Sequence, residues 1–228
     1  MTPSPLPFDE TQALAHLSAI DVHWARLIDG VGHIRFESRP AREPYEALIR
    51  AVSSQQLSNR AAAAIIGKLQ QRFDVGESGF PSAEQLVACE PEVLRQCGFS
   101  ARKIDTVKGI AQGVMSGLVP ARTAAEHLDD DTLIERLCTL KGIGRWTVEM
   151  LLISTLERMD IMPADDLGIK QGFRYLYRLP QDPTRKAMLE MSEPCRPYRT
   201  LAAWYLWRIP HMPDYAEYRA SLRQSTDE

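Results

Sequence analysis

The sequence predicts an all-α protein. Apolar residues recur at helical spacing in one segment after another, and the alternation of apolar and polar residues that marks a strand is nowhere sustained. Several segments also begin with a residue that suits a helix start. Ser58 precedes an alanine-rich run, Ser82 is followed by Gln85 three residues later, and Pro91 suits a first helical turn.

The first predicted helix covers residues 9–28. It ends before Gly30, a typical stop signal, and its apolar positions are Leu14, Leu17, Ile20, Trp24, Leu27 and Ile28. Residues 32–44 contain Pro40 and Pro44 and are predicted to be a linker.

Further helices are predicted after this linker, with short breaks between them. In the middle of the chain they cover residues 45–54, 58–73, 82–88, 91–97, 101–116, 130–140 and 145–156. The last third is predicted to hold helices at residues 169–177, 184–191 and 198–207, separated by Pro180, Pro194 and Pro197.

The composition is that of a globular protein. Of the 228 residues, 44% are hydrophobic and 25% are charged, which excludes disordered and fibrous classes. No apolar run reaches the length of a membrane-spanning helix, and residues 1–7 lack the basic and apolar regions of a secretory signal. We therefore expect an intracellular protein, in the cytoplasm of a bacterium or the nucleus of a eukaryote.

The cysteines do not form a metal-binding pattern. Cys89, Cys97, Cys138 and Cys195 are scattered without C-x-x-C spacing, so the sequence supports neither a zinc site nor an iron–sulfur cluster. We expect free thiols that are mostly buried.

The charge is unevenly distributed along the chain. The net charge is −3, yet acidic residues are few between residues 170 and 208. The basic residues of this stretch are Lys170, Arg174, Arg178, Arg185, Lys186, Arg196, Arg199 and Arg208. A basic face that suits nucleic acid is therefore compatible with the acidic total.

A glycine hairpin is predicted at Leu140-Lys141-Gly142-Ile143-Gly144-Arg145-Trp146-Thr147. The two glycines allow a tight turn whose N–H groups lie at the start of the next helix, where a phosphate is favoured. The alternative is a simple helix stop followed by a new helix, and the flanking Lys141, Arg145 and Trp146 favour the hairpin over it. With its flanking Lys141 and Arg145, the motif resembles the helix-hairpin-helix of the DNA glycosylase superfamily that includes endonuclease III and MutY. The resemblance implies DNA contacts by residues 141–145 and by Thr147.

The segment Pro163-Ala164-Asp165-Asp166-Leu167-Gly168-Ile169-Lys170 resembles the catalytic loop of the same superfamily. The match implies that Asp166 is the catalytic carboxylate and that Lys170 contacts DNA. The structural alternative is that Asp165 or Asp166 simply caps the following helix, and we expect Asp165 to be such a cap or to support Asp166. A carboxylate suits cleavage of an N-glycosidic bond, because positive charge develops on the sugar in the transition state.

Strand-cutting members of the superfamily carry a lysine nucleophile early in the second hairpin helix. Trp146 stands at the matching position, so we expect a monofunctional glycosylase that needs no cofactor. The resemblance also implies a monovalent cation, Na⁺ or K⁺, at the carbonyls of Cys138, Leu140 and Ile143.

Residues 51–58, Ala-Val-Ser-Ser-Gln-Gln-Leu-Ser, are similar to the S-Q-Q-x-S signature of AlkA and Mag type 3-methyladenine DNA glycosylases. The likeness continues through residues 97–103 and ends near Arg208. It implies that Gln55 and Ser58 contact DNA and that Gln56 or the adjacent Leu57 fills the space of a flipped nucleotide. Gln55 and Gln56 are alternatively a polar helix end without a role.

The base pocket is implied to contain Trp207 and Trp146, which would stack on a cationic alkylated purine. Met150 and Leu167 stand where the AlkA branch has tyrosines. Trp204 and Tyr205 are expected in the core rather than in the pocket.

The family's architecture consists of two helical lobes with the active site in the cleft between them. We place the boundaries near Pro44 and Ile161: residues 1–44 pack with residues 161–228 in one lobe, and residues 45–160 form the lobe with the helix-hairpin-helix. The 44 residues before Tyr45 leave no room for the β-rich domain of the longer AlkA type.

The leading hypothesis is an enzyme of base excision repair that removes 3-methyladenine, 7-methylguanine and related lesions from double-stranded DNA, acting as a monomer. A second hypothesis is a non-catalytic helix-hairpin-helix module that binds damaged DNA. A third is a glycosylase-lyase that uses a lysine outside the hairpin.

Overall fold

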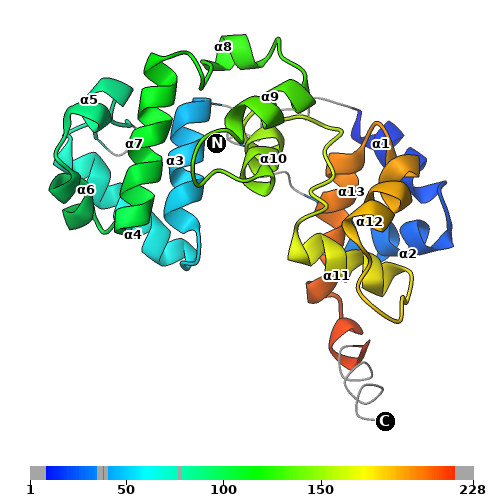
Figure 1. Cartoon of the computed structure of the whole chain (residues 1–228). Helices are drawn as coiled ribbons and strands as arrows, with labels where there is room; N and C mark the ends of the chain where they lie inside the picture. The colour runs from blue at the N-terminus through cyan, green and yellow to red at the C-terminus, as the bar shows by residue number, and fades with distance from the viewer. Residues whose placement is uncertain (1–8, 35–37, 39–40, 77–78, 219–228) are drawn as a thin grey trace. The chain divides into compact units, whose positions relative to one another are not determined.

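The computed structural model describes residues 9–34, 38, 41–76 and 79–218. All regular elements within these residues are helices, which confirms the all-α class predicted from the sequence (Figure 1). In this described part, no helix combines the length and the apolar character needed to cross a membrane.

The chain divides into two units, and each is described by itself. Unit 1 combines Met1–Ser38 with Glu157–Glu228, and unit 2 is Arg39–Leu156. The second division falls after Leu156, whereas the sequence placed it near Ile161. Residues of the segment 157–161 form hydrogen bonds with other residues of unit 1. The Ile161 N–H donates to the Thr200 hydroxyl at 3.1 Å, and Arg199 Nε donates to Asp160 Oδ1 at 2.7 Å.

Unit 1 is built from both ends of the chain. Its helices are α1 (Glu10–Ser18), α2 (Val22–Val31), α11 (Leu167–Leu176), α12 (Arg185–Ser192) and α13 (Arg199–Leu206), with 3₁₀ turns η1 (Glu193–Cys195) and η2 (Ile209–His211).

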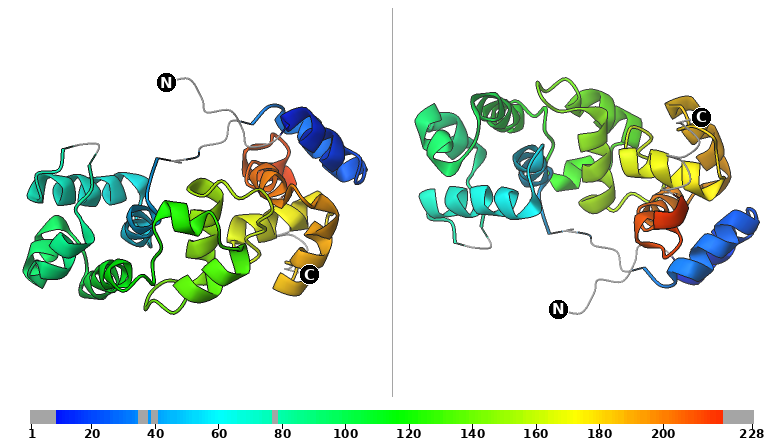
Figure 2. Two further views of the ribbon diagram at one scale, coloured as in Figure 1. Left: turned by 90° about the horizontal axis from the view of Figure 1, so that it is seen from above. Right: turned by 90° about the horizontal axis from the view of Figure 1, so that it is seen from below.

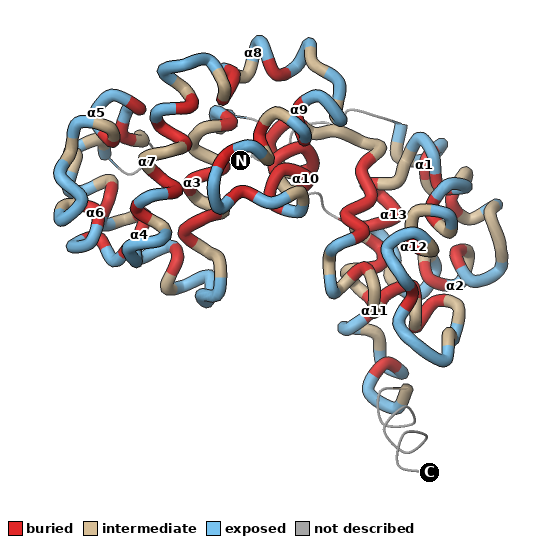
Figure 3. The backbone as a smooth tube through the Cα atoms, viewed as in Figure 1, coloured by how far each residue is buried: buried red, intermediate tan, exposed pale blue. Residues whose placement is uncertain are grey.

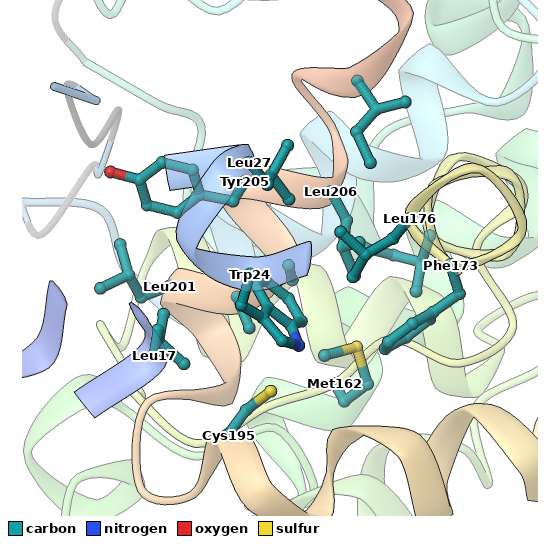
Figure 4. Close-up of a cluster of buried hydrophobic side chains, with 14 of the residues drawn as sticks. Leu17, Trp24, Leu27, Met162, Phe173, Leu176, Cys195, Leu201, Tyr205 and Leu206 are labelled. Atoms are coloured by element: carbon teal, nitrogen blue, oxygen red, sulfur yellow. The ribbon is translucent and has the colours of Figure 1, made fainter. Parts of the chain in front are cut away.

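The core of unit 1 surrounds Trp24, which is fully buried (Figure 4). Its ring meets Phe173 edge-on, with centroids 6.5 Å apart, and the cluster also contains Leu17, Tyr205 and Leu206. The N-terminal helices α1 and α2 therefore bury their apolar side chains against α11 and α13, which are distant in the sequence.

The single helix predicted over residues 9–28 is wrong, because the chain forms two helices there. Asp21 interrupts it: its Oδ1 accepts hydrogen bonds from the N–H groups of His23, at 2.8 Å, and Trp24, at 2.9 Å, and so begins α2. Gly30 lies inside α2, and the helix instead ends at Gly32, whose φ is +70°.

A hydrogen-bond chain extends this cap into the core. Trp24 Nε1 donates to the Tyr177 hydroxyl at 3.1 Å, and that hydroxyl donates to Asp21 Oδ2 at 3.0 Å. Burial, followed by the charge of Asp21, raises the pKa of Tyr177, so the phenol keeps the proton that it donates.

Unit 2 is continuous in sequence. Its helices are α3 (Pro44–Ser54), α4 (Asn59–Arg72), α5 (Ala83–Ala88), α6 (Pro91–Cys97), α7 (Ala101–Met115), α8 (Arg122–Ala125), α9 (Asp130–Leu137) and α10 (Arg145–Ser154). The sequence did not predict α8, and α9 ends at Leu137 rather than near residue 140.

Helix α7 is the centre of unit 2. It packs against α3, α5 and α6, and Figure 2 views α3 and α7 nearly along their axes, so the two run side by side. The buried positions of α3, α7 and α10 lie inside the unit (Figure 3). Both segments that join α3 to α4 and α9 to α10 are thus attached to one packed set of helices.

We predict that Asp21→Ala destabilises the fold by about 2 kcal/mol, because it removes a helix cap and the bond from Tyr177. Urea unfolding measures this change. Asp9→Ala is the matched control: Asp9 caps α1 through one exposed bond from Gln12 N at 3.2 Å, and its loss should cost about 0.5–1 kcal/mol. Equal losses in the two variants would contradict the proposed importance of the buried chain.

Candidate functional site

The residues singled out from the sequence are divided between the two units. Asp166, Leu167, Lys170 and Trp207 belong to unit 1. The segment 55–58, the hairpin 138–144 and the first turns of α10 belong to unit 2.

Asp166 is held at the start of α11. Its Oδ1 accepts a hydrogen bond from the Ile169 N–H at 3.0 Å and another from Trp207 Nε1 at 2.9 Å. Two donors on one oxygen, one from the backbone and one from α13's end, fix the orientation of the carboxylate. The start of a helix also favours negative charge.

The cap predicted for Asp165 is wrong. Asp166 is the N-cap of α11, while Asp165 is exposed and lies 3.3 Å from Arg185 Nε in an ion pair. Capping does not exclude a catalytic role for Asp166. The hydrogen bonds from the Ile169 N–H and from the Trp207 indole both fall on the same carboxylate oxygen, Oδ1.

Gly168 is a site residue that the sequence reasoning missed. A Cβ at this position would lie 3.0 Å from both Trp207 Cδ1 and Asp166 Oδ1. The absence of a side chain therefore lets the indole of Trp207 reach the carboxylate. A glycine in the first turn of a helix, two residues after a capping aspartate, was the available signal.

The other unit 1 residues differ in exposure. Leu167 is 62% exposed, and Lys170 is half-buried on α11. Trp207 packs edge-on against Trp204, with centroids 5.8 Å apart. The core placement of Tyr205 is confirmed, since it is 1% exposed, and Trp204 is partly buried against the same core.

The two hairpin glycines have different roles. Gly142 has φ +88°, a left-handed conformation, and a Cβ there would overlap the Thr106 hydroxyl oxygen. Gly144 is the N-cap of α10, has an ordinary φ of −100°, and has open space where a Cβ would lie. The predicted tight turn therefore depends on Gly142, while Gly144 leaves its backbone accessible to an outside group.

The hairpin presents backbone donors. Among the described residues, the N–H groups of Gly142, Gly144 and Arg145 donate no hydrogen bond. Ile143 and Thr147 differ: their N–H groups bond to Leu140 O at 3.1 Å and Gly144 O at 2.9 Å, and their side chains are buried. This burial argues against DNA contacts by the Ile143 and Thr147 side chains.

The two cations beside the glycines also differ. The Lys141 side chain is 83% exposed, and its ammonium lies 3.9 Å from Asp105. Arg145 Nε lies 2.8 Å from Glu149, whose carboxylate is buried. Lys141 is therefore the more available cation, whereas Arg145 forms an ion pair with Glu149.

Some carbonyl oxygens of the hairpin are left without hydrogen bonds in the described part of the chain. Within the described residues, the Cys138 and Ile143 carbonyls accept no hydrogen bond, and the Leu140 carbonyl accepts one, from the Ile143 N–H. Oxygen donors of this kind fit a hard cation. Histidine, cysteine, aspartate and glutamate side chains of the described part form no cluster that would hold a metal.

Residues 55–58 form the connection between α3 and α4, which we call the 55–58 loop. Gln55 caps α3 and its amide donates to Gly142 O at 3.4 Å; Ser58 caps α4 through the Ala61 N–H. Gln56 has φ +58° and is exposed, and Leu57 is 43% exposed. Both side chains are therefore accessible for insertion into DNA.

A cavity of about 430 Å³ adjoins the 55–58 loop. Gln55, Gln56, Lys103, Thr106 and Trp146 are among the residues that line it. Trp146 is 41% exposed at the start of α10, and Met150, one turn later, is half-buried. The sequence reasoning did not identify Lys103 or Thr106.

A helix that begins at a glycine hairpin with unbonded backbone N–H groups is suited to bind a phosphate of a nucleic acid. The chain belongs to the HhH-GPD superfamily of base excision DNA repair proteins, whose sequence pattern matches residues 49–197.

Individual relatives cover most of the chain. It is 51% identical over 208 residues to DNA-3-methyladenine glycosylase 1 of Schizosaccharomyces pombe, covering 91% of this chain and 90% of that protein. The solved complex of the S. pombe enzyme with abasic DNA matches with a TM-score of 0.80 over 90% of this chain and 98% of that one. A DNA-3-methyladenine glycosidase of Bacillus halodurans, 31% identical, also gives 0.80, covering 91% of this chain and 92% of that one.

We predict that Gly142→Ala destabilises the protein by about 2 kcal/mol or more, because alanine is strained at this φ and overlaps Thr106. Gly144→Ala should change stability by less than about 0.5 kcal/mol, since nothing crowds its Cβ. Thermal and urea unfolding of the two variants measure the difference. A Gly142→Ala protein as stable as Gly144→Ala would show that the Thr106 contact adapts freely.

Proposed function

We propose that this protein is a monofunctional DNA-3-methyladenine glycosylase of base excision repair. It hydrolyses the N-glycosidic bond of alkylated purines in duplex DNA after the nucleotide leaves the base stack. The observation that carries this proposal is the Asp166 carboxylate, oriented by the Ile169 N–H and by Trp207 Nε1. The 51% identity to the S. pombe glycosylase supports it over nearly the whole chain.

Asp166 acts on the sugar. As the base departs, positive charge develops at C1′, and a carboxylate held in a fixed orientation stabilises it and orients the attacking water. Because both donors bind Oδ1, the carboxylate need not reorganise when the charge appears. The base leaves with the electron pair of the broken bond, and the oxygen of the attacking water bonds to C1′ while one of its protons is released to solvent.

The alkylated base is itself a good leaving group. 3-Methyladenine and 7-methylguanine carry positive charge in DNA, so the enzyme needs no general acid for them. An aromatic face attracts such a cation, and Trp207 supplies an indole next to Asp166. The assignment of Leu167, Trp146 and Met150 to the same pocket stays a prediction.

The chain lacks a nucleophilic lysine at the start of α10. That position holds Trp146, which cannot form the Schiff base required for strand cleavage. The product is therefore an intact abasic site, and borohydride should trap no covalent adduct.

DNA contacts of unit 2 are assigned to the hairpin and the 55–58 loop. The N–H groups of Gly142, Gly144 and Arg145, together with Lys141, suit phosphate oxygens. In the 55–58 loop, the groove of a distorted duplex is assigned to Gln55, Gln56, Leu57 and Ser58. In unit 1, Lys170 is assigned to the DNA backbone. Affinity for DNA should fall steeply with salt concentration, because these contacts are mostly to phosphate.

A monovalent cation is part of this proposal. The carbonyls of Cys138, Leu140 and Ile143 would hold it, and it would add positive charge for a phosphate beside the hairpin. Catalysis itself needs no cofactor under this proposal.

We predict that Asp166→Asn lowers the single-turnover release of 3-methyladenine by about 100-fold or more, because the amide cannot stabilise the sugar cation. Asn retains an oxygen that can cap α11, so stability should change little. Asp165→Asn is the matched control and should retain the wild-type rate. Undiminished release by Asp166→Asn, or no release by the wild type, would instead favour a damage-binding module.

The Trp207 bond gives a second prediction. Trp207→Phe keeps an aromatic ring but removes the donor to Asp166, and Gly168→Ala crowds both the indole and the carboxylate, so that one of them must shift by a few tenths of an ångström. Each should slow base release by about 10-fold or more, as expected for loss of a hydrogen bond to a charged group. Tyr205→Phe, two positions earlier, removes the hydrogen bond from the Tyr205 hydroxyl to Gly32 O. It should lower the stability of the fold but leave the rate of base release unchanged. A Trp207→Phe enzyme with wild-type rate would exclude an orienting role for the indole.

A further inference from the structure

Helix α7 carries two lysines that satisfy the ends of neighbouring helices. Lys103 Nζ donates to Ser53 O and Gln55 O, both at 2.9 Å, where α3 ends. Lys108 Nζ donates to Val87 O and Cys89 O, where α5 ends. A cation is favoured at a helix C-terminus, which makes the two sites chemically equivalent. They differ in the segment that each one fixes.

The segment fixed by Lys103 is the 55–58 loop. The other carbonyls at the end of α3 have backbone partners: Gln55 N–H donates to Val52 O, and Leu57 N–H donates to Ser54 O. The carbonyls of Ser53 and Gln55 are left for Lys103. Directly after this clamp, Gln56 adopts a left-handed φ of +58°, an unusual conformation for a residue with a side chain.

The same end of α7 also contacts the hairpin. Thr106, one turn after Lys103, packs so closely on Gly142 that no side chain fits there. The Gln55 amide then links the two segments directly by donating to Gly142 O. One helix end therefore touches both segments that are assigned to DNA, and Lys103 and Thr106 both line the cavity that adjoins them.

We propose that Lys103 is a positioning residue: it holds the 55–58 loop in the conformation that inserts into DNA, at a spacing from the hairpin that α7 sets through Thr106. This inference rests on the proposed function. Lys103 acts through the loop and not on the reacting atoms. Partial burial lowers the pKa of Lys103, in keeping with an ammonium that is held beneath the loop rather than in open solvent.

The test compares Lys103→Met with Lys108→Met. Each variant removes one ammonium from α7 and leaves two helix-end carbonyls without their lysine donor. Urea unfolding should therefore show a similar loss of unfolding free energy for both. Lys103→Met should lower single-turnover release of 3-methyladenine by about 10-fold or more, since small misplacements of positioning groups reduce rates strongly. Lys108→Met should retain the wild-type rate, and Lys103→Arg should recover most of the loss.

Two further measurements separate positioning from general destabilisation. A duplex with an abasic-site analogue and a neighbouring 2-aminopurine reports insertion of the loop as a rise in fluorescence; the rise should be lost in Lys103→Met and kept in Lys108→Met. Amide hydrogen exchange should accelerate in residues 55–58 in the first variant and near residues 87–89 in the second. If Lys103→Met does not fold, Lys103→Gln, which keeps one donor, takes its place.

The outcomes are distinct. Equal rates and equal fluorescence for Lys103→Met and Lys108→Met, with an active wild type, would overturn the role of Lys103 and leave the proposed function standing. A wild type that releases no base would overturn the proposed function, while hydrogen exchange in residues 55–58 would still decide whether Lys103 holds the loop.

Discussion

Unsatisfied helix ends are the constraint on which this structure depends. The longest described helix, α7, has 15 residues and most are shorter, so the N–H and C=O groups that lack a partner within their helix are a large share of the backbone. Side chains satisfy many of them, either from the helix's own N-cap or from a neighbouring helix. Asp21 begins α2, Ser58 begins α4, Asp166 begins α11, and Lys103 and Lys108 complete α3 and α5. Asp166 and Ser58, two of the residues assigned to function, belong to this set of caps.

Asp166 shows why a cap is a good place for the carboxylate that we assign to catalysis. A side chain that must satisfy the first N–H groups of a helix has a fixed position, and the helix dipole favours its negative charge. The Trp207 indole adds a second donor, so the orientation of the carboxylate is determined by two helices rather than by one flexible side chain. Preorganisation of this kind is what stabilisation of a developing sugar cation requires.

Two glycines control how closely the functional groups approach. Gly168 allows Trp207 to reach Asp166, and Gly142 allows the hairpin to pack on Thr106. In both cases a missing side chain is needed by a residue far away in the sequence, 39 positions in one contact and 36 in the other by the residue numbers. Gly144 has no such neighbour, and its contribution is an open backbone.

The sequence by itself determined most of the helices and the family of this protein. Local periodicity and capping residues determine the helices, because both act within a few residues: Ser58, Ser82 with Gln85, and Pro91 begin helices as predicted. The motifs around Gly142 and Asp166 identify the family. The break at Asp21 was missed, since the apolar spacing continues across it while the cap draws on Tyr177, which lies in the other half of the chain. Only the tertiary structure decided that Trp207 reaches Asp166, that Thr106 packs on Gly142, and that Lys103 holds the 55–58 loop. Each of these contacts joins residues that are distant in the sequence and that packing brings together, and spacing along the chain carries no record of that.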